Sequence, residues 1–357
     1  MTTPLVSIRK LVLEASTARG TAHILRGIDL EVGRGRIVGV VGESGSGKSS
    51  LAACLLRLLP PNLSRLSGEI VFDGTDLLAL DDAAMATYRG ARIAMIFQDP
   101  MTALNPLFTI GTHLVDVLRR RHPGLARAEA LTRATNALTN VGIADAALRL
   151  ASYPHQLSGG MRQRAMIAMA LLVEPDLLVA DECTTALDAT VEAQIVALLE
   201  DLARKRRAAP SFLAPPRGGG RRNAAALGAL GSDFTGSIVF ISHHLGLVAQ
   251  LCDDVCVMYA GTIVETGPMA EVLARPRHPY TRALIDCELD DHAHGGRLVS
   301  IPGEVTDPLA PQVGCTFAPR CTHAAEVCRT TIPLLRDAGP DRRAACHLFE
   351  QIAAAVP

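Results

Sequence analysis

A glycine-rich segment, from Gly42 to Ser49, constrains this chain more than any other feature of its sequence. It follows the apolar run from Ile37 to Val41, which is typical of a buried strand. It precedes a stretch from Ser50 to Leu59 with helical character, which stops at Pro60-Pro61. In the order strand, glycine loop, helix, backbone N–H groups surround an anion and the helix N-terminus favours negative charge. The segment therefore predicts a phosphate-binding loop in an α/β fold.

The polar positions of this loop have separate expected roles. Lys48 would neutralise the β- and γ-phosphates of a nucleotide, and the Ser49 hydroxyl would ligate Mg²⁺. The remaining expected nucleotide contacts are Gly42, Ser44, Gly45, Ser46, Gly47 and Ser50. An ordinary glycine-rich turn is the alternative, but the strand and helix on either side favour the phosphate site.

Two further apolar runs predict buried strands that end in polar residues. Leu177 to Ala180 leads into Asp181-Glu182, and Ser237 to Ile241 leads into Ser242-His243. Beside a phosphate loop, Asp181 fits the role of holding Mg²⁺ and Glu182 that of a general base for water. Strands that alternate with helical stretches, such as the segment 109–150, indicate a largely parallel sheet covered by helices.

The order of these and other motifs resembles that of ABC transporter ATP-binding subunits. The motifs are Gln98 in Ile96–Pro100, Leu157–Arg164 at the start of an apolar helix, Thr185–Asp188, and His243. The resemblance implies the fold of a P-loop NTPase, an ABC nucleotide-binding domain with a helical subdomain. It implies catalytic roles for Lys48, Gln98, Glu182 and His243, and Mg²⁺ contacts from Ser49, Gln98 and Asp181. It also implies that Ser158, Gly159, Gly160 and Asp188 contact ATP across a head-to-tail dimer.

Further motifs narrow the resemblance to the oligopeptide/dipeptide importers. They are Phe97–Pro106, His278–Leu284, Ile301–Glu304 and the run from Gly314 to Cys321. By this resemblance the chain is a D-type ATPase subunit that powers peptide import from the cytoplasmic face of the membrane. The implied partners are a second ABC ATPase subunit, two membrane permease subunits and an extracytoplasmic solute-binding protein. The alternatives are the same role for nickel or another small solute, a non-transport ABC ATPase, and a non-catalytic ATP-binding partner.

Composition excludes several other classes of protein. With 35 Lys and Arg against 36 Asp and Glu, the formal net charge is −1, so no general nucleic-acid binder is expected. No run reaches the ~18 apolar residues of a membrane span, and no signal peptide is expected at the N-terminus. Together with the resemblance, these observations predict a peripheral membrane-associated protein.

The last part of the chain concentrates its cysteines. Cys315, Cys321, Cys328 and Cys346 follow the spacing C-x5-C-x6-C-x17-C, which is typical of neither a zinc finger nor a ferredoxin. In the resembling subfamily this tail carries a [4Fe–4S] cluster in some members, so we expect one here, with Zn²⁺ and free thiols as alternatives. The other five, Cys54, Cys183, Cys252, Cys256 and Cys287, are expected to pack as small apolar groups.

The expected domains are an ABC ATP-binding domain over 1–285 and a small Cys-containing C-terminal module over 286–357. The first would contain a helical subdomain at about 99–165 and an insertion rich in Ala, Pro and Gly at about 208–234. That insertion is expected to be a tolerated surface loop, with a regulatory arm as the alternative.

Three positions depart from the family pattern. The usual adenine-stacking aromatic is replaced by Ala15, and no aromatic residue precedes Phe72. This departure predicts loose discrimination between ATP and GTP. Cys183 and His244 stand where the family usually has Pro and Asp, and we expect modest effects from both.

Overall fold

The computed structural model describes residues 3–183, 192, 195–197, 236–293 and 300–354. The 208–234 insertion and the segment from Thr185 to Asp188 lie outside these residues. The chain divides into two compact units, Met1–Asp82 with Ser237–Pro357, and Ala83–Gly236. Each unit is described by itself.

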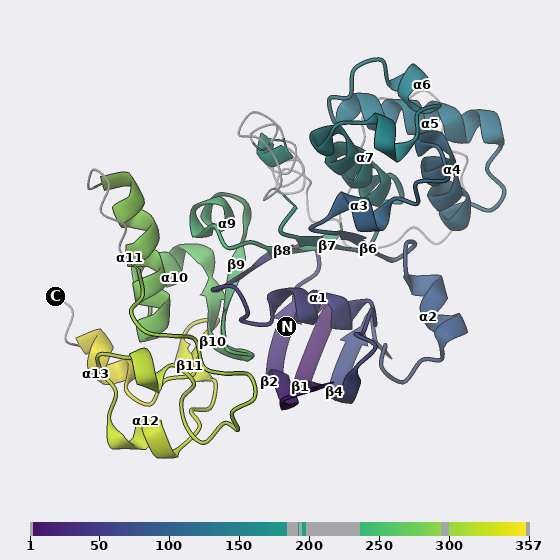
Figure 1. Cartoon of the computed structure of the whole chain (residues 1–357). Helices are drawn as coiled ribbons and strands as arrows, with labels where there is room; N and C mark the ends of the chain where they lie inside the picture. The colour runs from purple at the N-terminus through teal and green to yellow at the C-terminus, as the bar shows by residue number, and fades with distance from the viewer. Residues whose placement is uncertain (1–2, 184–191, 193–194, 198–235, 294–299, 355–357) are drawn as a thin grey trace. The chain divides into compact units, whose positions relative to one another are not determined.

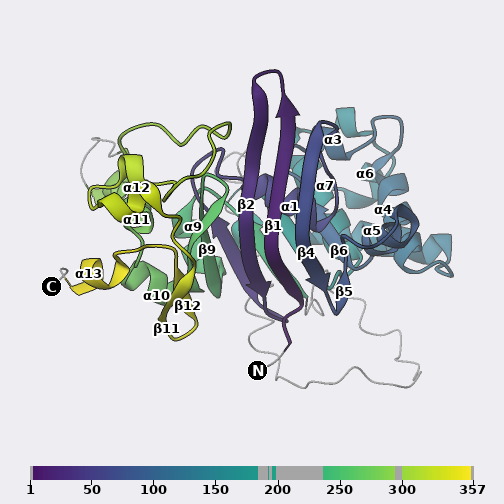
Figure 2. The ribbon, with the colours of Figure 1, turned by 90° about the horizontal axis from the view of Figure 1, so that it is seen from below.

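The first unit begins with an antiparallel sheet of order β2-β1-β4-β5. Its strands are β1 (Val6–Thr17), β2 (Gly20–Val32), β4 (Leu63–Phe72) and β5 (Thr75–Asp76). Val6 pairs with Val32 on one side and with Phe72 on the other, and Figure 2 shows β2, β1 and β4 side by side. The strands β1 and β2 are longer than the short β-like runs that the sequence suggests, because a tight turn at Thr17–Gly20 joins them directly.

The second sheet of this unit has the order β11-β12-β10-β9-β3-β8. The bounds are β3 (Ile37–Val41), β8 (Ser237–Ile241), β9 (Asp254–Tyr259), β10 (Thr262–Pro268), β11 (Arg336–Gly339) and β12 (Arg342–Ala344). β3 pairs in parallel with β8 and β9, and every residue of β3 and β8 is buried. Such two-sided burial explains why both strands are unbroken apolar runs, and the strands at Ile37–Val41 and Ser237–Ile241 are confirmed.

Helices complete the first unit. They are α1 (Lys48–Leu55), α9 (Leu245–Leu251), α10 (Met269–Ala274), α11 (Pro279–Ala293), η2 (Ala318–Arg320), α12 (Glu326–Thr330) and α13 (Phe349–Ala354). The expected helix from Ser50 to Leu59 ends at Leu55, because Arg57 adopts a left-handed φ of 51°. Its guanidinium donates to the carbonyls of Leu77 and Leu80, which fixes this conformation.

The C-terminal part of the chain extends the second sheet. β12 pairs antiparallel with β10, and β11 pairs with β12. The expected boundary between 285 and 286 falls inside α11.

The second unit is mainly helical. It contains α2 (Asp82–Tyr88), α3 (Pro100–Ala103), α4 (Ile110–Arg121), α5 (Arg127–Asn140), α6 (Ala146–Arg149), η1 (Pro154–Gln156) and α7 (Gly159–Leu172). Within it α4, α5 and α7 pack against one another, as Figure 1 shows. Ala130, Ala134 and Ala137 form a buried stripe on α5, and this small-residue face permits close helix packing. The helical segment at 109–150 is confirmed.

The same unit holds two parallel strands, β6 (Ile93–Ile96) and β7 (Leu177–Asp181). The strand expected at Leu177–Ala180 is therefore present and extends to Asp181, which places this carboxylate at the carboxyl end of a buried strand.

Candidate functional site

The glycine-rich loop joins β3 to α1 as the sequence predicts. Gly42 has φ 153°, and a Cβ there would lie 2.1 Å from the carbonyl oxygen of Met258. Gly47 caps α1 with φ 99°, so both positions require glycine. Gly47 has no side chain that could cap α1, and the first turn of the helix points positive backbone charge at the loop. This arrangement suits an anion.

Lys48 is folded back over the loop. Its side chain is buried, and Nζ donates to the carbonyls of Gly42 at 2.8 Å and Glu43 at 3.1 Å. The ammonium is therefore held at the mouth of the loop. Next to it, the buried Ser46 hydroxyl has no hydrogen-bond partner among the described residues.

Glu43 itself is held by residues of the C-terminal part of the chain. Its carboxylate forms an ion pair with Arg320, and its backbone N–H donates to the hydroxyl oxygen of Tyr280 at 2.8 Å. The sequence motifs contain both residues, His278–Leu284 and Gly314–Cys321, yet nothing in the sequence assigns either a contact with the phosphate loop.

In the second unit, two predicted catalytic residues are in direct contact. The Gln98 amide Nε2 donates to the Glu182 carboxylate oxygen Oε2 at 2.9 Å. Asp181, which immediately precedes Glu182, is 5% exposed at the end of β7. Glu182 has a left-handed φ of 43°, which turns the chain sharply as the strand ends. A buried carboxylate, a second carboxylate and an amide thus gather at one strand end.

The turn after Glu182 is tied to α7. Gln163 is buried in α7, and its Nε2 donates to the carbonyl of Cys183 at 2.8 Å. Ser158 caps the same helix, because its Oγ accepts the N–H of Met161 at 3.3 Å. Gly159 and Gly160 form the first residues of the helix. The sequence predicts Ser158 as an N-cap, but the tie from Gln163 is visible only in the structure.

His243 follows β8 in the first unit, and its ring is exposed. The centre of its ring lies 4.5 Å from the centre of the His244 ring. The α9 N-terminus that follows is capped from a distance, since the Glu288 carboxylate of α11 accepts the N–H groups of Leu245 and Gly246. This contact fixes the end of the loop that carries His243.

At the position expected for an adenine-stacking aromatic, Ala15 is buried in β1. The neighbouring Glu14 carboxylate pairs with His23 Nδ1 at 2.9 Å. His23 thus has a partner within the sheet.

The four tail cysteines share one small cavity. Cys315, Cys321, Cys328 and Cys346 line it together with His278, Phe317, His323 and His347. Burial raises the pKa of both Cys315 and Cys346 to about 11, and negative charge on the other tail thiolates adds to the rise. Among the described residues, no group of three or more His, Cys, Asp or Glu side chains could hold a metal ion. The expected iron–sulfur cluster is therefore not confirmed, although its four candidate ligands line the same cavity.

The other cysteines are buried with the exception of Cys287, which is half-buried. Burial raises the pKa of Cys54, Cys183 and Cys256 to about 12, which keeps these thiols neutral. In the part of the chain that the structure describes, no helix is both long and apolar enough to cross a membrane.

The fold is that of known ABC nucleotide-binding cassettes. A dimeric post-hydrolysis structure of the ATP-binding cassette MJ0796 bound to ADP and Pi has a TM-score of 0.60 and 22% identity. The similarity covers 74% of this chain and 98% of that one. The structure of cbiO1 from Clostridium perfringens, part of the ABC transporter complex cbiONQ, gives a TM-score of 0.55 at 25% identity. It covers 76% of this chain and 92% of that one.

Family patterns and full-length relatives narrow the class. The ABC transporter pattern matches residues 25–185, and the pattern "Oligopeptide/dipeptide transporter, C-terminal region" matches residues 264–328. The "Probable peptide ABC transporter ATP-binding protein y4tR" of Sinorhizobium fredii is 44% identical to this chain. The alignment covers 98% of this chain and 96% of that protein. OppD of Salmonella typhimurium, an oligopeptide transport ATP-binding protein, is 40% identical over 96% of this chain and 93% of its own. The chain belongs to the ATP-binding proteins of the oligopeptide/dipeptide ABC transporter family, and as a member it is an ABC ATPase.

Proposed function

We propose that this chain hydrolyses ATP to power the import of oligopeptides or dipeptides across the cytoplasmic membrane. The observation that carries the proposal is that likeness to peptide transport proteins runs through the whole chain. It includes the C-terminal region at 264–328 as well as the cassette. The relatives y4tR and OppD are named for peptide and oligopeptide transport, and this chain would share that substrate class.

The contacts in each unit suggest how the chemistry is divided. Lys48, held over the loop by two carbonyls, would exchange them for the phosphate oxygens of ATP. Glu182 would accept a proton from the attacking water as general base, with Gln98 orienting its carboxylate through their hydrogen bond. His243 would polarise the γ-phosphate, and Ser158, Gly159, Gly160 and Asp188 would contact the ATP of a partner subunit.

The donor set fits Mg²⁺. Ser49, Gln98 and Asp181 offer a hydroxyl, an amide and a carboxylate oxygen, and Mg²⁺ binds oxygen ligands. When bound, Mg²⁺ would neutralise phosphate charge. The chain's own contribution is to place the buried Asp181 carboxylate at the end of a rigid strand.

The working unit would be a dimer of ABC ATPase subunits, homomeric or heteromeric, on two membrane permeases with an extracytoplasmic solute-binding protein. We further propose the domain division 1–285 and 286–357, with the helical subdomain at about 99–165. The chain would work at the cytoplasmic face of the membrane.

Reconstituted transport tests this function. The chain is assembled with its partners in liposomes, and uptake of labelled di- to pentapeptides is compared with uptake of nickel. We expect ATP-dependent peptide uptake that Lys48→Ala abolishes, while an exposed surface control, Arg119→Ala, keeps the rate. Nickel uptake without peptide uptake would overturn the assigned solute.

The tail cysteines have a proposed ligand of their own. We propose that Cys315, Cys321, Cys328 and Cys346 hold a [4Fe–4S] cluster, or Zn²⁺ in its absence. In support, the four side chains line one cavity, and a bound metal ion or cluster would compensate the charge that thiolate ligands carry there. Anaerobically purified protein should show a broad band near 400 nm and about four iron per chain.

A matched variant pair sharpens this test. Cys328→Ser should remove the absorption band, and the half-buried Cys287→Ser, outside the cavity, should keep it. Protein with neither iron nor zinc, whose four tail thiols all react with a thiol reagent after unfolding, would contradict the proposal.

A further inference from the structure

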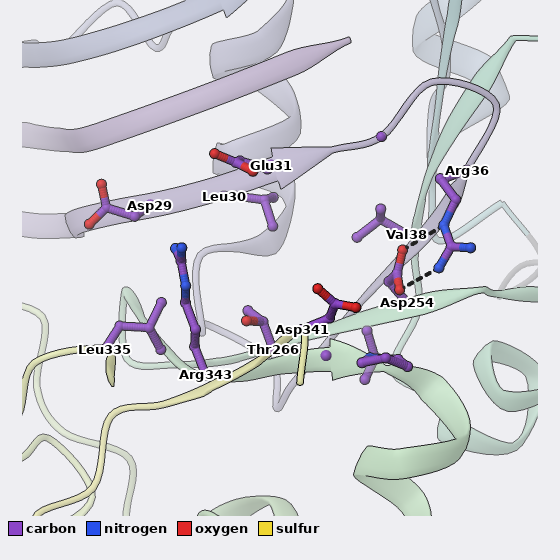
Figure 3. Close-up of a pocket in the computed structure, with 14 residues that line it drawn as sticks. Asp29, Leu30, Glu31, Arg36, Val38, Asp254, Thr266, Leu335, Asp341 and Arg343 are labelled. Carbon is purple, nitrogen blue, oxygen red and sulfur yellow. Dashed lines mark hydrogen bonds and ion pairs between the residues drawn. The ribbon is translucent and has the colours of Figure 1, made fainter. Parts of the chain in front are cut away.

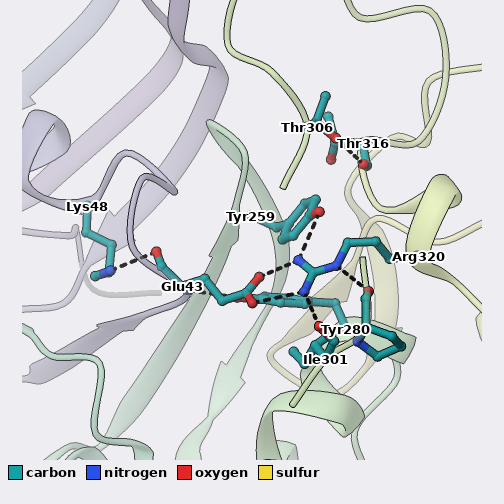
Figure 4. Close-up of polar contacts among 9 residues, drawn as sticks. Glu43, Lys48, Tyr259, Tyr280, Ile301, Thr306, Thr316 and Arg320 are labelled. Carbon is teal, nitrogen blue, oxygen red and sulfur yellow. Dashed lines mark hydrogen bonds and ion pairs between the residues drawn. The ribbon is translucent and has the colours of Figure 1, made fainter. Parts of the chain in front are cut away.

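Arg320 places a guanidinium group against the phosphate loop from the C-terminal part of the chain. Nη1 lies 2.6 Å from Glu43 Oε2, and Nη2 lies 3.1 Å from Glu43 Oε1. This two-point contact is the strong fork geometry of arginine with a carboxylate. Figure 4 shows Glu43 between Arg320 on one side and Lys48 on the other.

Every N–H of Arg320 is used. Besides the two contacts with Glu43, Nη2 donates to the carbonyl of Ile301 at 2.8 Å and Nε to that of Pro302 at 2.9 Å. Nη1 also donates to the Tyr259 hydroxyl at 3.3 Å. Arginine has five N–H donors, so this set leaves none over. The side chain is 3% exposed, and its position is therefore fixed by the protein.

A glycine and several aromatic rings pack around the Arg320 side chain. Gly303 has φ 83°, and a Cβ there would lie 3.2 Å from Arg320 Cγ. The guanidinium carbon lies 5.8 Å from the centre of the Tyr259 ring. Phe317 contacts the rings of both Tyr259 and Tyr280. In a chain with only 3% aromatic residues, this concentration marks a specific structure.

Tyr280 holds the backbone at the same point. Its hydroxyl accepts the Glu43 N–H at 2.8 Å, while the Glu43 carbonyl accepts Lys48 Nζ at 3.1 Å. The carboxylate, N–H and carbonyl of one loop residue thus all have fixed partners. Its backbone cannot rotate without breaking these bonds.

Charge gives the contact a second consequence. A lone carboxylate within the phosphate loop would repel the phosphates that the loop binds, and a fully paired guanidinium cancels that charge. We propose that Arg320, with Tyr280, is a positioning residue of the phosphate loop: it fixes Glu43 and neutralises its carboxylate, so that the loop accepts a nucleoside triphosphate. The inference rests on the proposed ATP-binding function of the loop.

The same unit contains a second two-point ion pair for comparison. Arg36 also contacts a carboxylate at two points, with Asp254 oxygens at 2.9 and 2.6 Å. Figure 3 shows this pair on the wall of a different cavity, which residues of β2, β9 and β10 also line. Among the described residues, no hydrogen bond joins Arg36 to Gly42–Ser49. Arg36→Gln therefore reports what loss of a two-point ion pair elsewhere in the unit, with a more exposed arginine, does to the fold.

The test measures nucleotide affinity of the full-length chain in the presence of Mg²⁺. Arg320→Gln should weaken ATP binding about fivefold, since one uncompensated charge then faces the phosphates. The loss should be smaller for ADP, which carries less charge, and smaller at high salt. Arg36→Gln should leave both affinities unchanged.

The double variant separates charge from folding. Glu43→Gln combined with Arg320→Gln should recover most of the lost ATP affinity, because no lone carboxylate is then left in the loop. A merely structural contact predicts the opposite, a double variant no better than Arg320→Gln. If Arg320→Gln does not fold, Glu43→Gln alone decides, and it should bind ATP at least as tightly as the wild type.

Two failures are distinguishable. Wild-type protein that does not bind ATP would refute the proposed function. If the wild type binds ATP, and Arg320→Gln binds ATP and ADP as tightly as the wild type does, the positioning role alone is refuted.

Discussion

Single residues in this molecule are held by bonds to groups that the sequence places far away. Gln98 reaches Glu182, Gln163 reaches the carbonyl of Cys183, and Arg320 reaches Glu43. Each contact fixes a side chain or a turn next to a proposed reacting group. Such contacts reduce the number of arrangements in which Glu182 or the phosphate loop would be unproductive.

A buried histidine makes stability depend on pH. His278 is fully buried, and burial lowers its pKa to about 3. Its Nδ1 accepts the Tyr280 N–H at 3.0 Å, which requires the ring to be unprotonated there. Because the unfolded chain binds a proton near pH 6.5 and the folded chain does not, stability is complete above pH 6.5. It is lost progressively as the pH falls from 6.5 towards 3.

Between pH 7.5 and pH 5 this residue should cost about 2 kcal/mol of unfolding free energy. Denaturant unfolding at the two pH values measures the cost. His278→Asn, whose Oδ1 can accept the same N–H, should remove most of the difference, and the exposed His155→Asn should keep it. An unchanged pH dependence in His278→Asn would contradict this account.

At the scale of elements, the strands around the candidate site are predictable because burial on both faces leaves continuous apolar runs. Ile37–Val41 and Ser237–Ile241 are predicted with their full bounds, and β7 is predicted except for its last residue, Asp181. The early end of α1 is not, since it depends on carbonyls beyond the helix that bind Arg57. The lengths of β1 and β2 also depend on pairing between segments, which a local pattern does not contain.

The candidate site divides in the same way. The expected roles of Lys48, Asp181, Glu182 and His243 can be predicted from the sequence, because the order of the motifs places each of these side chains at a strand end or a helix start. The supporting contacts of Arg320, Tyr280 and Gln163 do not follow, because generic donors become specific only when the fold supplies an acceptor.

At the scale of the whole molecule, the C-terminal part is joined to the nucleotide-binding part by structure as well as by sequence. Its strand β12 extends the sheet that contains β3, and its Arg320 contacts the loop after β3. The family-specific C-terminal region therefore shares a unit with the phosphate loop. The cavity with the four tail cysteines lies in the same unit, and Arg320 directly precedes Cys321.

The central claim is that this chain turns over ATP with Glu182 as general base to power transport. The most direct measurement is ATP hydrolysis by the assembled transporter carrying Glu182→Gln, with the exposed Glu174→Gln as control. We predict at least a ~100-fold loss of turnover with ATP retained on the protein, because general-base catalysis contributes about that much or more. The control should hydrolyse ATP at the wild-type rate. Undiminished hydrolysis by the Glu182→Gln transporter would contradict the account.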